Sequence, residues 1–327
     1  MPIKLDLKDR KILYELDRNA RQPASQIAKN VGLSPDGVNY RIKRLLKGGA
    51  IFKFMTLLDT AKLGLATYKV FYRLQNMTLQ KEQEILSTLV QHPHTQLVTS
   101  AEGMFDLNVN FLAASVGDLN ATLTGLNAAY GAYIAERQVN IMVESHFFLR
   151  DYLVGKPSAE MRKPMVFGSK PAPAELDIYH RKILALLAQD ARIPAVEIAK
   201  RSGLSADAVI QRIRKLEKAG IIQNYVLFPN TEEIGCRWQY LLLRFRDLTP
   251  ERERHFFQYC RLHQNVWFYS KMIGPWDCVI NIEAEHDQQF KELLMEIKKE
   301  FSRILKEYTI LKITKTHKFN QYPMGES

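Results

Sequence analysis

The chain has 327 residues, of which 46% are hydrophobic and 25% are charged, a composition that is ordinary for a soluble globular protein. No apolar run approaches the roughly 20 residues that a membrane-spanning helix needs, and the N-terminus does not resemble a secretory signal, so we expect a cytoplasmic protein without a membrane partner. The net charge of +11 arises mainly from residues 1–54 and 175–225. This distribution favours either a polyanion partner or a basic face that serves solubility.

The sequence repeats itself without a gap when Leu5 is placed on Leu176. LDLKDRKIL at 5–13 then matches LDIYHRKIL at 176–184. GLSPDGVNYRIKRL in the first copy likewise matches GLSADAVIQRIRKL in the second. We therefore predict two copies of one unit, joined by a proline-rich linker at 155–174. Within the linker, the apolar run MVF is expected to dock onto one of the domains.

Residues 1–60 are expected to form a winged helix-turn-helix domain. Apolar residues recur at helical spacing over about 8–19, and a second helix follows. Ser34 is expected to cap a third helix over about 35–47. IFKFMTLLD at 51–59 favours a short β-ribbon, the wing.

Residues 61–154 are expected to form a small α+β domain. Four stretches are rich in β-forming residues and two show helical periodicity, in the order strand, helix, strand, strand, helix, strand. This order is typical of a ferredoxin-like domain, in which both helices cover one face of an antiparallel sheet. The other face of the sheet needs a cover.

The second copy repeats the head at 175–231 and the α+β domain at 232–327, and so supplies that cover. We predict an α+β fold with two winged helix-turn-helix heads, each followed by a βαββαβ effector and oligomerisation domain. The two βαββαβ domains are expected to pack face to face as an intramolecular pseudo-dimer with two-fold symmetry.

The third helix of each head presents amide and basic side chains on its outer face, as in helix-turn-helix proteins that bind double-stranded DNA. Lysine suits phosphates, whereas arginine reads guanine and asparagine or glutamine reads adenine. The base-reading candidates are Asn39, Arg44, Gln211 and Arg214. The phosphate-binding candidates are Lys43, Lys47, Lys215 and Lys218, and Ser34, Tyr40 and Ser205 complete the DNA-binding set. The alternative for each is a solvated helix face. Arg41 and Arg212 are instead expected to form ion pairs within the heads.

These motifs resemble the leucine-responsive regulator/AsnC (Lrp/AsnC) family of bacterial and archaeal transcription factors. The matching elements are LDLKDRKIL, AR-x-P-x-x-x-IAK-x-x-GLS, RIKRL and the turns GMFD at 103–106 and GPWD at 274–277. The resemblance implies a DNA-binding regulator with a prokaryotic, nucleoid-associated location. It also implies a small effector, commonly an amino acid, between the second domains, and assembly into homo-oligomers.

The resemblance carries an effector-binding role over to four turn residues, for which turn chemistry is the alternative: Gly103, Asp106, Gly274 and Asp277. The chain departs from the family plan because two non-identical units are fused. Asn39 is matched by Ile210 and Tyr40 by Gln211, so we expect the two heads to read different half-sites.

Two other functions remain open. Sirohaem decarboxylases are similar to this family and work as paired, non-identical units, and four histidines recur in register as candidates for such a site: His92, His146, His263 and His317. A ligand sensor whose heads no longer bind DNA is the second alternative.

The three cysteines form no Cys-x-x-Cys pair and no other catalytic motif occurs, so no metal site, cofactor or enzymatic activity is expected.

Overall fold

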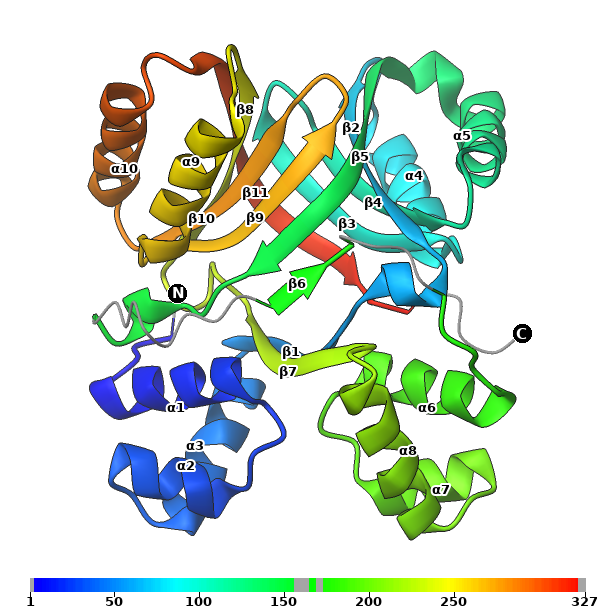
Figure 1. Cartoon of the computed structure of the whole chain (residues 1–327), viewed down its shortest axis with the longest axis vertical. Helices are drawn as coiled ribbons and strands as arrows, with labels where there is room; N and C mark the ends of the chain where they lie inside the picture. Colours follow the sequence, from blue (N-terminus) through cyan, green and yellow to red (C-terminus); the bar gives the residue numbers. More distant parts are fainter. Residues whose placement is uncertain (1–2, 156–164, 169–172, 323–327) are drawn as a thin grey trace.

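The computed structural model describes residues 3–155, 165–168 and 173–322. It confirms the α+β class and the two three-helix heads, which lie side by side at one end of the molecule (bottom of Figure 1). The helices of the first head are α1 (Leu7–Arg18), α2 (Ala24–Val31) and α3 (Pro35–Lys47). Those of the second head are α6 (Ile178–Gln189), α7 (Ala195–Ser202) and α8 (Ala206–Lys218).

Capping residues set the helix boundaries in both heads. Asp6 and Asp9 form a capping box at the start of α1, so two backbone N–H groups that would lack partners are satisfied. Ser34 accepts a hydrogen bond from the backbone N–H of Gly37 and thereby caps α3. Gly32, with a φ of 68°, ends α2 in the left-handed conformation that glycine adopts without steric cost.

The expected wing of the first head is not a ribbon of its own. Strand β1 (Ile51–Leu58) pairs antiparallel with β7 (Ile222–Pro229) of the second head, with Met55 opposite Val226. The prediction of a separate β-ribbon was therefore wrong. Each unit supplies a single strand before the chain turns towards the α+β domain, so each strand finds its hydrogen-bond partner in the other unit. The resulting two-stranded sheet joins the heads.

The βαββαβ order is present in both units. The first contains β2 (Ala66–Leu74), α4 (Leu79–Gln91), β3 (Thr95–Gly103), β4 (Leu107–Ala113), α5 (Val116–Tyr130) and β5 (Ile134–Phe147). The second contains β8 (Arg237–Phe245), α9 (Pro250–Leu262), β9 (Val266–Ile273), β10 (Cys278–Ala284), α10 (Asp287–Glu300) and β11 (Leu305–Phe319). Short 3₁₀ turns occur at Thr60–Leu63, Gly131–Tyr133 and Asp151–Leu153.

The two sheets also join through their edges, which the sequence did not predict. Strand β11 pairs with β3, β5 pairs with both β9 and β2, and the eight long strands close into a ring (Figure 1). This closure is possible because β5 and β11, with 14 and 15 residues, extend beyond their own sheets. The predicted pseudo-dimer is therefore a closed barrel, with the four helices of the two domains on its outside.

Glycines stand where the two units meet most closely. A Cβ atom on Gly103 would lie 2.7 Å from the carbonyl oxygen of Ile310, and one on Gly274 would lie 2.7 Å from that of Val139. Both glycines have a positive φ, at 132° and 151°. Any larger residue would therefore force the paired strands apart.

The barrel interior forms a core that is rich in aromatic residues, including Phe71, Phe105, Trp238, Trp267 and Trp276. Each unit also has a core of its own between its strands and its two outer helices. The short strand β6 (Met165–Phe167) pairs with the end of β5, so the docking of this linker run is confirmed. The flanking linker positions 156–164 and 169–172 lie outside the described residues.

Buried ion pairs fix the first head to the barrel. The Arg150 guanidinium, which is fully buried, lies 2.7 Å from Asp17 of α1 and 2.8 Å from Glu283 of β10. The hydroxyl group of Tyr152 also donates to Glu283, at 2.6 Å. Glutamine at 321 and alanine at 188 stand at the positions of Arg150 and Asp17 in the second unit. This anchor therefore belongs to the first head alone.

Candidate nucleic-acid interface

The outer face of α3 carries most of the side chains that the sequence assigned to DNA. Asn39, Lys43 and Lys47 are exposed, and the Tyr40 side chain is 69% exposed. Asn39 and Lys43 lie four residues apart, as do Lys43 and Lys47, so the three share one face of the helix. An exposed face with amide and cationic groups can donate hydrogen bonds to bases and phosphates at the same time.

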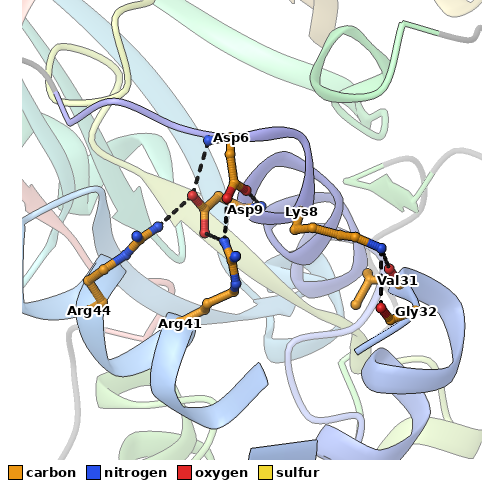
Figure 2. Close-up of polar contacts among 7 residues, drawn as sticks. All are labelled: Asp6, Lys8, Asp9, Val31, Gly32, Arg41 and Arg44. Atoms are coloured by element: carbon orange, nitrogen blue, oxygen red, sulfur yellow. Dashed lines mark hydrogen bonds and ion pairs between the residues drawn. The ribbon is translucent and has the colours of Figure 1, made fainter. Parts of the chain in front are cut away.

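Arg44 and Arg41 are both turned towards α1 (Figure 2). The Arg41 guanidinium lies 2.8 Å from Asp9 and 2.7 Å from Asp6, which confirms its predicted structural role. The Arg44 guanidinium lies 2.5 Å from the same Asp9, whose side chain is 1% exposed. The Arg44 side chain is still 44% exposed, but its charge is paired with Asp9, whereas no carboxylate among the described residues pairs with the exposed Lys43 and Lys47.

The Asp6 carboxylate is strongly stabilised in its charged form. Hydrogen bonds from Arg41 and from the backbone of Asp9 lower the pKa of Asp6 to about 2. Lys8 contributes a further contact within the head, because its ammonium group donates to the carbonyl oxygens of Val31 and Gly32 at the end of α2 (Figure 2). The three helices of the first head are thus held together by polar contacts as well as by their apolar core.

The second head replaces two members of this network. His180 stands at the position of Asp9, and Lys215 stands at the position of Arg44. The Arg212 guanidinium keeps its pair with Asp177, at 2.6 Å, as expected for this residue. Among the described residues no carboxylate pairs with Lys215, which is exposed together with Gln211, Arg214 and Lys218. Ser205 caps α8 by accepting from the N–H of Ala208.

Two equivalent arginines hold the heads together. Arg21 donates to the carbonyl oxygens of Ala191 and Ile193, and Arg192 donates to that of Ala20. The Arg21 and Arg192 guanidinium groups also lie over aromatic rings of β7 and β1. These contacts, together with the β1–β7 pair, hold α3 and α8 in a defined relative position. This clasp was not predicted from the sequence, although the two arginines recur in register within the repeat.

The predicted effector turns have structural partners. The carboxylate of Asp106 accepts from the backbone N–H of Leu74, at 2.6 Å, and that of Asp277 accepts from the N–H of Phe245, at 2.7 Å. Gly103 and Gly274 provide the close approach between strands described above. Turn chemistry therefore explains these four residues without a ligand, and their effector-binding role stays a prediction.

Comparison with known proteins identifies the heads. The family model of the winged helix-turn-helix DNA-binding domain matches residues 5–51 and again residues 176–223. The HTH-type transcriptional regulator FL11 of Pyrococcus furiosus is 30% identical over 128 residues, which cover 39% of this chain and 83% of that protein. The leucine-responsive regulatory protein of Rhizobium meliloti is 46% identical over 61 residues, covering 19% of this chain and 39% of the relative.

Solved structures also resemble the chain along nearly its whole length. The siroheme decarboxylase NirDL superposes with a TM-score of 0.61 over 96% of this chain and 93% of its own, at 14% identity. This similarity shows a shared fold. In the described part of the chain, no helix is long and apolar enough to cross a membrane, and no group of three or more His, Cys, Asp or Glu side chains is arranged to hold a metal ion.

Proposed function

Because this chain belongs to the Lrp/AsnC family of transcriptional regulators, we propose that it binds specific DNA sequences through α3 and α8, each entering a major groove. The observation that carries this proposal is the pair of clasped heads at one end of the molecule, each with an exposed amide and basic face. A two-fold related pair of recognition helices suits two half-sites about 34 Å apart or a multiple of that distance.

The two recognition faces differ, so the operator need not be a palindrome. Asn39 and Tyr40 of α3 correspond to Ile210 and Gln211 of α8. Asparagine and glutamine both pair with adenine, but these two stand at non-equivalent positions. Each head therefore prefers its own half-site.

Regulation is proposed to come from a small metabolite, such as an amino acid, that binds between the two βαββαβ domains. A ligand changes DNA affinity only if it binds one arrangement of the heads more tightly than another. The closed barrel and the Arg150 anchor provide a physical connection from the domain interface to α1. Further assembly of the fused units into homo-oligomers is part of the same proposal.

Selection from a randomised duplex pool, followed by fluorescence anisotropy at two salt concentrations, tests the DNA-binding function. We expect enrichment of a bipartite site and an affinity that falls steeply with salt, because cationic side chains release counterions from phosphates. A pool without enrichment and an anisotropy that salt does not change would overturn the proposal.

Single substitutions on α8 then separate base contacts from phosphate contacts. Arg214→Ala is expected to cost about 1–3 kcal/mol of binding free energy and to relax the preference at one base pair. Lys218→Ala should instead weaken the affinity for all DNA sequences equally and reduce the slope of log affinity against log salt by about 1. Lys299→Ala provides the matched control, since Lys299 is an exposed residue of α10 on the barrel. If Arg214→Ala behaves like Lys299→Ala, a base-reading role of Arg214 is excluded.

A second candidate function, a tetrapyrrole-converting enzyme, is favoured by the whole-chain similarity to siroheme decarboxylase. Two of the four candidate histidines have polar partners within the protein: His146 lies 2.6 Å from Glu144, and His317 lies 2.8 Å from the hydroxyl group of Ser100. Burial lowers the pKa of both. Titration with sirohaem distinguishes the two functions, since a saturable change in its visible spectrum would favour the enzyme.

A further inference from the structure

The strand β11 has a free edge next to the two-stranded sheet that joins the heads. Its pairing with β8 ends at Ile313, which lies opposite Trp238, whereas β11 itself continues to Phe319. On this side, no strand in the described part of the chain pairs with the backbone of residues 314–319. The opposite side of the same stretch pairs with β3. Unpaired N–H and C=O groups along such an edge are a template for a further strand.

The equivalent edge of the first unit is occupied. Residues 145–147 of β5 correspond to 316–318 of β11 in the repeat, and they pair antiparallel with β6 (Figure 1). The backbone N–H group of Gly168, directly after β6, donates to the carboxylate of Asp59 at 3.1 Å. The protein therefore already contains one example of an extended apolar segment bound at this kind of edge.

An open groove of about 710 Å³ runs beside the free edge of β11. The equivalent groove of the first unit, where Phe167 of β6 forms part of the wall, has about 370 Å³. The larger groove is lined in part by Phe52, whose side chain is 41% exposed. Asn230, which stands at the position of Asp59, also lines it. An exposed aromatic ring and a side-chain amide are thus available beside the unpaired backbone.

The charge at the edge differs between the two units. Lys315 of β11 lines the groove and stands at the position of Glu144 of β5. Lys315 is exposed, and among the described residues no carboxylate pairs with it. In the sequence, β6 is flanked by basic residues, namely Arg162, Lys163 and Lys170. A basic segment suits an edge that carries a glutamate, whereas an edge that carries a lysine favours an acidic segment.

The other charged residues of the groove leave this preference in place. Lys312 pairs with Glu102 at 2.9 Å, and Arg237 pairs with Asp287. The second carboxylate of the lining, that of Glu232, belongs to the turn between β7 and β8 and not to the edge strand. The charge on the edge strand itself is therefore positive.

We propose that the free edge of β11 binds an extended, acidic segment of a partner polypeptide, which adds a strand antiparallel to residues 314–319. The backbone of the segment pairs with β11, an apolar side chain contacts Phe52, and a carboxylate lies near Lys315. Pairing with a second copy is disfavoured, because two β11 edges would bring their lysines together. Since Phe52 belongs to β1, the partner also contacts the sheet that joins the heads. This inference goes beyond DNA recognition.

Fluorescence anisotropy with labelled peptides and the full chain tests the site. The first peptide carries the β6 sequence MVFG between two pairs of glutamates, and the second carries it between two pairs of lysines. The third is the acidic peptide with N-methyl groups on the three amides of MVF, which block strand pairing without changing a side chain. The acidic peptide should bind at least about tenfold more tightly than either control. No binding of the acidic peptide at about 1 mM, or equal or tighter binding of a control, would overturn the proposal.

Hydrogen exchange locates the bound peptide. Amides of residues 314–319 should become protected when the acidic peptide binds, because they gain strand partners. Residues 145–147 should not change, since β6 already covers their edge. Protection that excludes residues 314–319 would overturn the proposal.

Substitutions then assign the contacts. Lys315→Glu reverses the charge of the edge and should weaken the acidic peptide about three- to tenfold while it strengthens the basic peptide by a similar factor. Lys299→Glu, the same change on the exposed side of α10, is the matched control and should alter neither affinity. Phe52→Ala should weaken the acidic peptide about fivefold, because an apolar contact is lost. If Lys315→Glu behaves like Lys299→Glu, the acidic-segment site is excluded.

Sedimentation of the wild type addresses the alternative occupant. We expect no self-association that the acidic peptide reverses. A dimer that the acidic peptide dissociates would assign the edge to a second copy of this chain and overturn the proposal. None of these measurements involves DNA, so a failure of DNA binding leaves them interpretable, and the reverse also holds.

Discussion

At the scale of single residues, Arg150 shows how a buried charge holds one head in place. Removing a cation from a buried ion pair leaves its partners charged and unpaired, which typically costs about 3–5 kcal/mol. Arg150→Met should therefore lower the free energy of unfolding by about that amount, as measured by urea denaturation. The double variant Arg150→Met/Asp17→Asn should recover part of the loss. A single variant as stable as the wild type would show that the anchor contributes nothing.

The pH dependence of the same variant follows from Asp17. Burial raises the pKa of Asp17 to about 6, and the charge of Arg150 opposes this rise. An acid whose pKa is higher in the folded state than in the unfolded state loses stability as pH rises between the two values, here from about 4 to 6. Without Arg150 the folded pKa rises further, so Arg150→Met should continue to lose up to about 1.4 kcal/mol per pH unit above pH 6. This additional slope should vanish in the variant that also carries Asp17→Asn.

At the scale of the helices, Asp9 decides whether Arg44 is available to DNA. Asp9→Asn removes the carboxylate that holds Arg44, while Arg41 keeps Asp6 as its partner. One additional cation at the phosphate backbone steepens the slope of log affinity against log salt by about 0.9. We expect this change in Asp9→Asn and no change in His180→Asn, the equivalent substitution of the second head. Equal slopes in wild type and Asp9→Asn would show that Asp9 does not control a contact between Arg44 and DNA.

The same elements show what the sequence could predict. The helices of the heads and the βαββαβ order follow from local signals, such as the Ser34 cap and the alternation of apolar residues. The pairing of β1 with β7 and the closure through β3 and β11 depend on contacts between positions far apart in the chain, for which one sequence gives no register. Strand β11 was predictable from its own residues, but its open edge required the structure, because the sequence does not show which residues pair beside it.

At the scale of the whole molecule, the arginine clasp and the β1–β7 pair make the spacing of the heads rigid. Inserting 5 base pairs between the selected half-sites rotates them to opposite faces of the duplex, and inserting 10 restores the face but moves them one turn, about 34 Å, apart. A flexible tether would tolerate the second insertion, whereas a rigid pair tolerates neither. We therefore expect both insertions to lower affinity by about 100-fold or more, towards that of a single head.

Anisotropy with the two lengthened duplexes measures this directly, and Arg21→Ala/Arg192→Ala provides the matched change in the protein. Loss of both clasp arginines should lower the affinity for the original site. The 10-base-pair insertion should then reduce the affinity less than it does in the wild type, because the heads can separate. Tolerance of the 10-base-pair insertion by the wild type itself would show that the contacts between Arg21 and the second head open on DNA. The rigid arrangement would then describe the free protein alone.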